Sequence, residues 1–212
     1  LMHRVYLFRD GIDSNNYMLY FYNSNEYKMC VSFEHCKFGS KGIDVDNPEY
    51  AGGALTKSRL KSYVYIYYAR MLNIRDCVIN YAITGNSSNC HGIYCRFPEI
   101  LHVEDVKVYS PLNYGSYEYY PLCLSENSDD GIECEIRNIS QELIFNGTYE
   151  YIPCLLRVSG YLNARIHNIS INMADRGLSE VRPANLYLQN NLIYFSYLRD
   201  FTVSDITVNI PR

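Results

Sequence analysis

The 212-residue sequence contains no tryptophan, no CxxC pair and only five histidines. Its formal net charge is −4, and its Lys and Arg residues are scattered, which argues against nucleic acid as a partner because phosphate binding needs a basic surface. No apolar run approaches the roughly 20 residues of a membrane-spanning helix. No signal-peptide pattern opens the chain. We therefore expect neither a nucleic-acid partner nor a membrane span.

The eight cysteines show no spacing typical of metal ligands, so the sequence predicts no metal site. Cys36 and Cys77 stand where other copies of the repeat described next have Val or Ile. We expect most of the cysteines to be free thiols, and these two to be small buried apolar residues.

An eight-residue pattern recurs six times in the chain, at intervals of 41, 29, 33, 30 and 37 residues. Its first four positions alternate apolar and polar, which is typical of a half-buried strand. The sixth position is apolar as well, and so is the eighth except at Gln141. The copies are VSFEHCKF (31–38), LNIRDCVI (72–79), LHVEDVKV (101–108), CEIRNISQ (134–141), ARIHNISI (164–171) and FTVSDITV (201–208).

The alternation changes phase at the fifth position, so one strand of period two cannot bury both apolar sets on one side. This change predicts a corner between two short strands. The residues there are His, Asp or Asn, and Asn and Asp in particular tolerate a left-handed backbone. They are His35, Asp76, Asp105, Asn138, Asn168 and Asp205.

A corner at the same place in every copy predicts that the copies stack in parallel register. Residues at the outward fourth position support this prediction, because in the first four copies opposite charges alternate and would be cross-strand neighbours. They are Glu34, Arg75, Glu104, Arg137, His167 and Ser204.

These six windows, with their Asn/Asp corner, resemble the right-handed parallel β-helix proteins. That pectin-lyase-like group includes polysaccharide lyases, polygalacturonase-type hydrolases and phage tailspikes. The resemblance implies an all-β fold, a right-handed parallel β-helix (solenoid) of about six rungs with loop excursions, and three strands per turn. We expect a single domain over residues 1–212 that is a segment of a longer chain, with a lead-in or irregular first rung at 1–26 and rungs at 27–210.

The segment before the corner is also repeated. Residues 65–76, 94–105 and 194–205 align without a gap, and each begins with a tyrosine followed three residues later by another aromatic residue. This alignment predicts a third strand and a short corner, with Tyr65, Tyr94 and Tyr194 on the wall. A Gly-Ile pair that recurs at Gly92 and Gly131 predicts a glycine at a corner.

Function is expected in three loops, at 39–62, 109–133 and 172–192. Hydrolysis of a glycosidic bond needs two carboxyl groups. The Asp129-Asp130 pair, with Glu126 nearby, resembles the paired aspartates of polygalacturonase-like enzymes, although Gly-His-Gly and Arg-Ile-Lys motifs are missing; the alternative is a solvated turn. Lyase chemistry would need a base, for which His91 is a candidate, beside carboxylates that bind Ca²⁺.

Tyrosine is abundant, with 23 residues. The second loop contains four closely spaced tyrosines, whose rings could stack on sugars or form a subunit surface: Tyr114, Tyr117, Tyr119 and Tyr120.

The family resemblance favours a phage tailspike or tail-fibre-like protein of the virion. It would bind cell-surface polysaccharide as a homotrimer in a larger assembly, and whether it also cleaves the polysaccharide is left open at this point. The alternatives are a secreted or surface bacterial polysaccharide lyase or hydrolase, and a non-enzymatic adhesin or virion structural segment.

Overall fold

The computed structural model describes residues 2–3, 6–9, 17–24, 26–40, 62–80, 91–111, 120–124, 131–144, 151–152, 154–173, 187–188 and 191–209. Over these residues the fold is all-β. No helix occurs in them, and therefore none that is long and apolar enough to cross a membrane. The strands are β1 (Met2–His3), β2 (Tyr6–Arg9), β3 (Tyr17–Tyr22), β4 (Met29–Glu34), β5 (Lys37–Ser40), β6 (Ser62–Asn80), β7 (His91–Pro111), β8 (Tyr120–Leu124), β9 (Gly131–Ile144), β10 (Tyr151–Ile152), β11 (Leu156–Met173), β12 (Tyr187–Leu188) and β13 (Ile193–Asn209).

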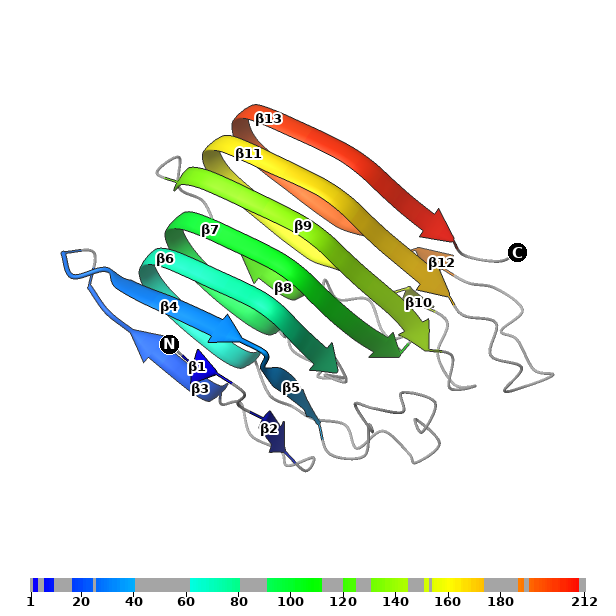
Figure 1. Ribbon diagram of the computed structural model, residues 1–212, viewed down its shortest axis with the longest axis horizontal. Helices are drawn as coiled ribbons and strands as arrows, with labels where there is room; N and C mark the ends of the chain where they lie inside the picture. Colours follow the sequence, from blue (N-terminus) through cyan, green and yellow to red (C-terminus); the bar gives the residue numbers. More distant parts are fainter. Residues whose placement is uncertain are drawn as a thin grey trace.

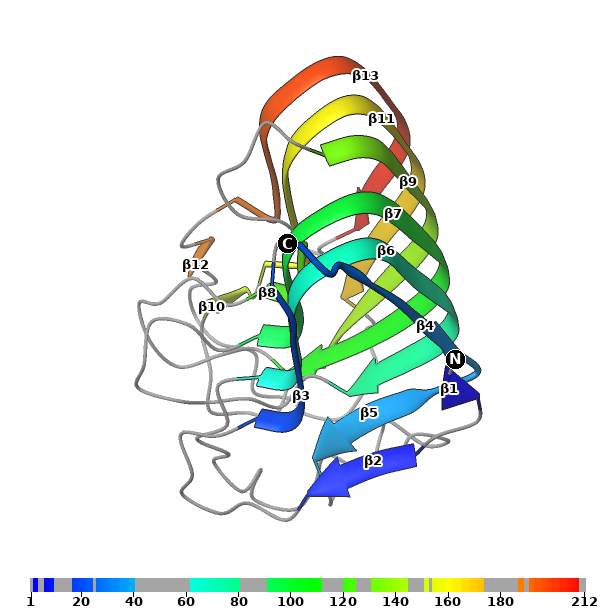
Figure 2. The ribbon, with the colours of Figure 1, turned by 90° about the vertical axis from the view of Figure 1, so that its left-hand side faces the viewer.

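The strands stack in parallel, as the repeat predicts. The pairs β4 with β6, β6 with β7, β7 with β9, β9 with β11 and β11 with β13 are all parallel, and they bring successive copies of the repeat side by side. Figure 1 shows the long strands lying one above the next, and in Figure 2 the same strands are seen to bend around a common interior.

The predicted corner is confirmed in all six copies. The six residues at the fifth position have positive φ angles between 49° and 56°. The alternating charges of the fourth position are also neighbours in register: Glu34 pairs with Arg75, Arg75 with Glu104, and Glu104 with Arg137. Arg137 Nη2 lies 2.7 Å from Glu104 Oε1.

A second corner lies eight residues before the first in β6, β7, β11 and β13, and an aromatic residue forms it in three of these four strands. Tyr68, Phe97 and Tyr197 have φ angles of 60°, 60° and 52°. In β11 the same place in the register is taken by Gly160, with φ 83°. The two corners divide β6 into three short segments, which agrees with the predicted third strand.

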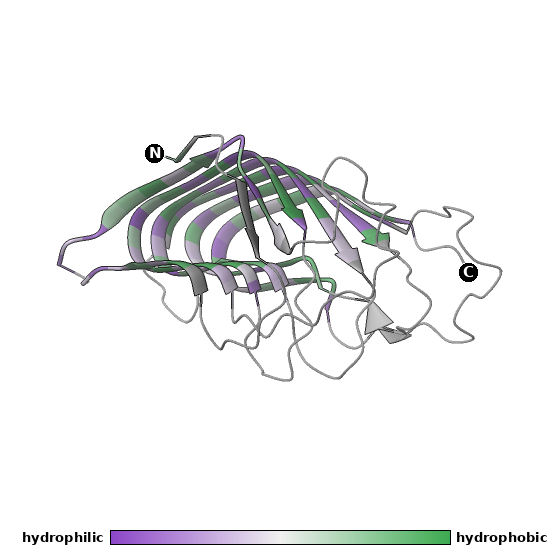
Figure 3. Ribbon diagram, turned by 90° about the horizontal axis from the view of Figure 1, so that it is seen from below, coloured by the Kyte–Doolittle hydropathy of each residue, from purple (hydrophilic) through white to green (hydrophobic). Residues whose placement is uncertain are grey.

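Inward apolar side chains form one core along the stack. In the first five copies, the first and third positions are all at most 7% exposed. In the sixth copy Phe201 is 58% exposed and Val203 is only partly buried, so the prediction of a buried position is wrong there. Among the described strands β13 pairs with β11 alone, and no other described strand lies on its far side. Figure 3 shows polar and apolar residues alternating along the stacked strands.

Gln141, the one polar residue at the closing position, is fully buried. Its Nε2 donates to Ser110 Oγ at 3.1 Å and to the Cys154 carbonyl oxygen at 3.3 Å. The amide nitrogen is therefore satisfied, whereas Oε1 is buried and has no hydrogen-bond partner within the described part of the chain.

The sequence predicts Gly92 and Gly131 at a corner, but they lie in strands β7 and β9, and neither has a positive φ. Both are needed for close packing instead. A Cβ on Gly92 would lie 2.5 Å from the Pro121 carbonyl oxygen, and one on Gly131 would lie 2.5 Å from the Gly160 carbonyl oxygen.

Seven cysteines fall in the described residues, and all seven are free thiols, which confirms the prediction for this part of the chain. Cys36 and Cys77 are buried in the core at the predicted positions. Burial raises the pKa of the Cys77 thiol to about 12 and also raises the pKa values of Cys95 and Cys134. These thiols are therefore protonated and unreactive near neutral pH.

Candidate functional site

Most of the residues proposed from sequence for catalysis and sugar binding lie outside the described residues. These are Glu126, Asp129, Asp130, Tyr114, Tyr117 and Tyr119. Their roles stay predictions. His91 and Tyr120 are described, and both belong to a group of aromatic residues on one wall of the stack.

Tyr120 begins β8 and is only 1% exposed, so it does not offer its ring to a sugar at the surface. It packs in a small cluster with Tyr94, Cys123 and Cys154. The sequence assigned Tyr120 to a loop with the other tyrosines. Pairing of β8 between β7 and β11 buries it instead.

Tyr65, Tyr94 and Tyr194 line the wall, as predicted. They belong to one row of six residues that runs across neighbouring strands. Each member of this row is the register partner of the next member. Along the stack this row reads Tyr20, Tyr65, Tyr94, Cys123, Arg157 and Tyr194. Tyr65 and Tyr94 stack with ring centroids 4.8 Å apart, and Arg157 lies over the Tyr194 ring at 5.1 Å.

Four tyrosines at the β3 end of this wall form what we call the tyrosine surface: Tyr20 and Tyr22 on β3, and Tyr65 and Tyr67 on β6. Alternate residues of a strand share a face, and register partners stand opposite each other, so the four rings form a two-by-two array. Within a strand, the ring centroids of Tyr20 and Tyr22 are 6.2 Å apart and those of Tyr65 and Tyr67 are 6.3 Å apart. Between the strands, the centroids of Tyr20 and Tyr65 are 5.3 Å apart and those of Tyr22 and Tyr67 are 5.4 Å apart.

The outer edge of the tyrosine surface is accessible to solvent. Tyr20 is 55% exposed and Tyr22 is 63% exposed. Their ring planes are inclined to each other by only 12°, so the two rings are nearly parallel neighbours on one face of β3. Among the described strands β3 pairs with β6 and no other, so the rings of β3 are stacked on one side by those of β6.

A cation and two further aromatic rings border the tyrosine surface. The Arg96 guanidinium lies 5.3 Å from the Tyr67 centroid and 4.9 Å from that of Phe97, and both distances are typical of cation–π contacts. Tyr68 and Phe97, the residues of the second corner, stack at 5.0 Å. This end of the wall therefore combines aromatic rings, phenol hydroxyls and one positive charge.

His91 is buried next to Tyr94, the register partner of Tyr65. Its ring stacks on Tyr94 with centroids 5.1 Å apart. Burial lowers the pKa of His91 to about 4, although a hydrogen bond to the Tyr120 backbone acts in the opposite direction. Nδ1 has no hydrogen-bond partner and is shielded from solvent. At neutral pH the imidazole is therefore uncharged, and its ring packs against the tyrosines.

The sequence reasoning gave no role to Tyr20, Tyr22 or Tyr67. A signal was present, because tyrosines two residues apart in strand-like sequence, at 20 and 22 and again at 65 and 67, must share a face. What it could not provide was the register between β3 and β6. Comparisons of the chain with known protein families, with curated proteins and with solved structures gave no match.

Proposed function

We propose that this chain is part of a right-handed parallel β-helix that binds a polysaccharide at the tyrosine surface. The architectural part of the proposal is supported by parallel register over successive copies and by two corners in each of β6, β7, β11 and β13. The observation that carries the functional part is the array of stacked tyrosines with Tyr20 and Tyr22 exposed at its edge.

The chemistry of these side chains suits sugars. The apolar face of a pyranose ring packs on an aromatic ring, and phenol hydroxyls both donate and accept hydrogen bonds. Rigid, stacked rings also lose little conformational freedom on binding. The four rings do not supply the paired carboxylates that glycosidic hydrolysis needs. We therefore propose binding as the function of this surface, and cleavage stays a prediction for Asp129, Asp130 and Glu126.

The sequence resemblance extends the proposal to the biological setting. We propose a tailspike-like or tail-fibre-like segment that recognises polysaccharide on a cell surface and assembles as a homotrimer in a larger virion protein. Stacked strands make a rigid support, which suits a role in holding a binding surface away from a particle.

The test is a glycan array of bacterial capsule and O-antigen polysaccharides, followed by calorimetry on any polysaccharide that binds. Tyr22→Ala should weaken binding by about tenfold or more, which corresponds to about 1.4 kcal/mol. Tyr197→Ala is the matched control, because Tyr197 is 69% exposed and lies on β13 at the other end of the stack. The control should bind like the unchanged protein.

Two results would contradict the proposal: no binding to any polysaccharide, or equal binding by the Tyr22 and Tyr197 variants. A loss of binding in Tyr117→Ala or Tyr119→Ala, with Tyr22→Ala unaffected, would move the sugar site to the second loop. Light scattering measures the trimer independently of the sugar.

A further inference from the structure

A histidine and two glutamates converge on the outer wall, away from the tyrosine surface. Residues His102 on β7 and Glu133 and Glu135 on β9 each offer one ligand atom, and these atoms all lie within 4.8 Å of one another. No other group of at least three His, Cys, Asp or Glu residues comes together in this way within the described part of the chain.

The parallel register explains why the three side chains meet. His102 is the direct register partner of Glu135. Glu133 lies two residues before Glu135, so both carboxylates project from the same face of β9. The backbone therefore fixes the positions of all three residues, and only side-chain rotations remain to be adjusted.

His102 provides the second observation. Its Nε2 atom is shielded from solvent and has no hydrogen-bond partner, although the side chain as a whole is 41% exposed. The nearest acidic atom, Glu133 Oε1, lies 3.8 Å away, which is too far for a hydrogen bond. A polar nitrogen that is covered and unpaired carries a free-energy cost that a bound cation would remove.

We propose that His102, Glu133 and Glu135 bind a divalent transition-metal cation, for which Zn²⁺ fits best. One imidazole nitrogen and two carboxylates form a three-ligand set that leaves a fourth position open. Tetrahedral zinc needs ligand atoms roughly 3.3–3.6 Å apart, given bonds of about 2.0–2.2 Å, so modest side-chain rotation suffices. Ca²⁺ fits less well, because it takes six to eight oxygen ligands.

The surrounding charges set the strength of the site. Arg137 Nη1 lies 3.8 Å from Glu135 Oε1, but the same guanidinium is held at 2.7 Å by Glu104. Arg165 is the register partner of Glu135 on β11. Glu133, Glu135 and Arg165 also line a surface hollow of about 570 Å³ together with Asp200. The two arginines beside the carboxylates should weaken cation binding, and the hollow gives solvent access to both glutamates.

The experiment is a titration of the metal-free protein with Zn²⁺ by calorimetry, and with Co²⁺ by absorption spectroscopy. One equivalent should bind. The Co²⁺ spectrum should show the ligand-field bands of a nitrogen and oxygen site without the intense thiolate band that cysteine ligands give. His102→Gln and Glu135→Gln should each weaken binding by about tenfold or more.

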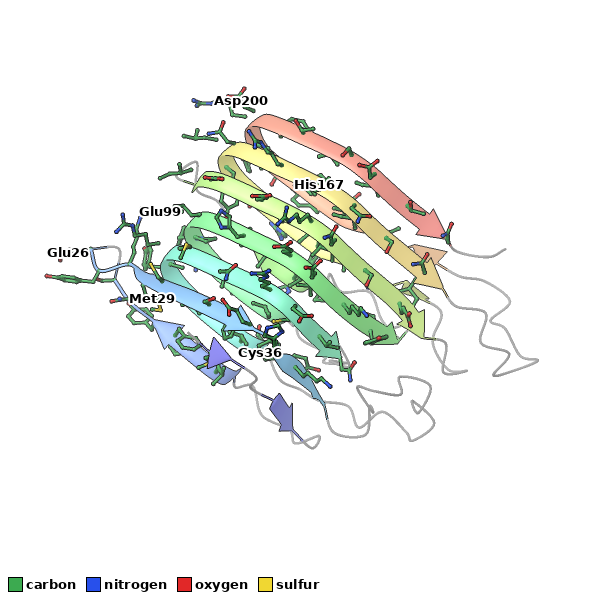
Figure 4. All side chains as sticks on the ribbon, in the orientation of Figure 1. Glu26, Met29, Cys36, Glu99, His167 and Asp200 are labelled. Atoms are coloured by element: carbon green, nitrogen blue, oxygen red, sulfur yellow. The ribbon has the colours of Figure 1, made fainter. Side chains whose placement is uncertain are left out.

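His167→Gln is the matched control, because His167 lies on the same outer wall, on β11, beside Arg137 in register (Figure 4). This variant should bind like the unchanged protein, and circular dichroism should show the same strand content in all four proteins. The proposal is overturned if Zn²⁺ does not bind up to about 1 mM. It is equally overturned if His102→Gln and His167→Gln bind alike, or if the Co²⁺ spectrum shows thiolate ligands.

Discussion

Asn138 donates a hydrogen bond from its Nδ2 to Oδ1 of Asp105, over 2.8 Å and across 33 residues of sequence. Asn168 donates in the same way to Oδ1 of Asn138, at 2.7 Å. These two hydrogen bonds join the corner side chains of three successive strands, and His35 contacts Asp76 in the same way at the start of the stack. The ladder changes at Asp76 and Asp105, whose flanking residues are register partners, because neither side chain carries the amide N–H that the asparagines donate.

Asp105→Asn should therefore stabilise the protein. The new amide can accept from Asn138 and donate to Asp76, and it removes one of two neighbouring negative charges. We expect the free energy of unfolding to rise by about 0.5–1 kcal/mol. Asn and Asp both tolerate the φ of 55° at this corner, so the backbone is not perturbed. Urea unfolding measures the change.

Asp105→Ala is the control for this prediction. It removes the acceptor used by Asn138 and places a residue without a polar side chain in a left-handed conformation, so it should destabilise the protein. If the Asn variant is no more stable than the original, the two carboxylates do not weaken the ladder.

His91 should make the protein less stable in acid. Its pKa is lowered from 6.5 to about 4 by burial, so between these values the unfolded chain binds a proton that the folded protein does not. The stabilising contribution is complete above about pH 6.5 and is lost as the pH falls towards 4. The loss from this one group is about 3 kcal/mol.

His91→Gln tests this prediction, since the amide can still donate to the Tyr120 backbone but does not titrate. Urea unfolding of both proteins is compared at pH 7 and at pH 4. The stability difference between them should change by about 3 kcal/mol over this interval. A constant difference would mean that the imidazole is protonated equally easily in the folded and unfolded chains.

Gly131→Ala should destabilise the protein by about 1–3 kcal/mol, because the added methyl group would meet the Gly160 carbonyl oxygen and the Tyr161 ring, each at 2.5 Å. Ile132→Ala is a neighbouring control at a side chain that is 50% exposed, and it should change stability by less than about 0.5 kcal/mol. Thermal unfolding compares the two variants. Equal melting temperatures would show that the backbone at Gly131 has room to move.

The local pattern of the sequence was sufficient to predict the strands, the first corner and the stacking. The reason is that parallel register aligns identical positions of a repeat, so one eight-residue window constrains all of its copies. His35 and Asp205, far apart in the chain, share a corner conformation that residue type alone indicates. The buried cysteines follow from the same logic, because Cys36 and Cys77 replace Val and Ile at an inward position.

The tertiary structure decided what the repeat could not. Tyr68 and Phe97 adopt left-handed corners although their residue type disfavours it, because strands on both sides of them are held in register and the two rings stack. Tyr20 is exposed and Tyr120 is buried, a contrast that depends on which strands lie beside them. His102 meets Glu133 and Glu135 through the in-register pairing of β7 with β9. Sequence periodicity determines which face of a strand a side chain occupies. Strand pairing determines which side chains lie beside it. Both candidate sites consist of side chains from paired strands, so strand pairing decides where they form.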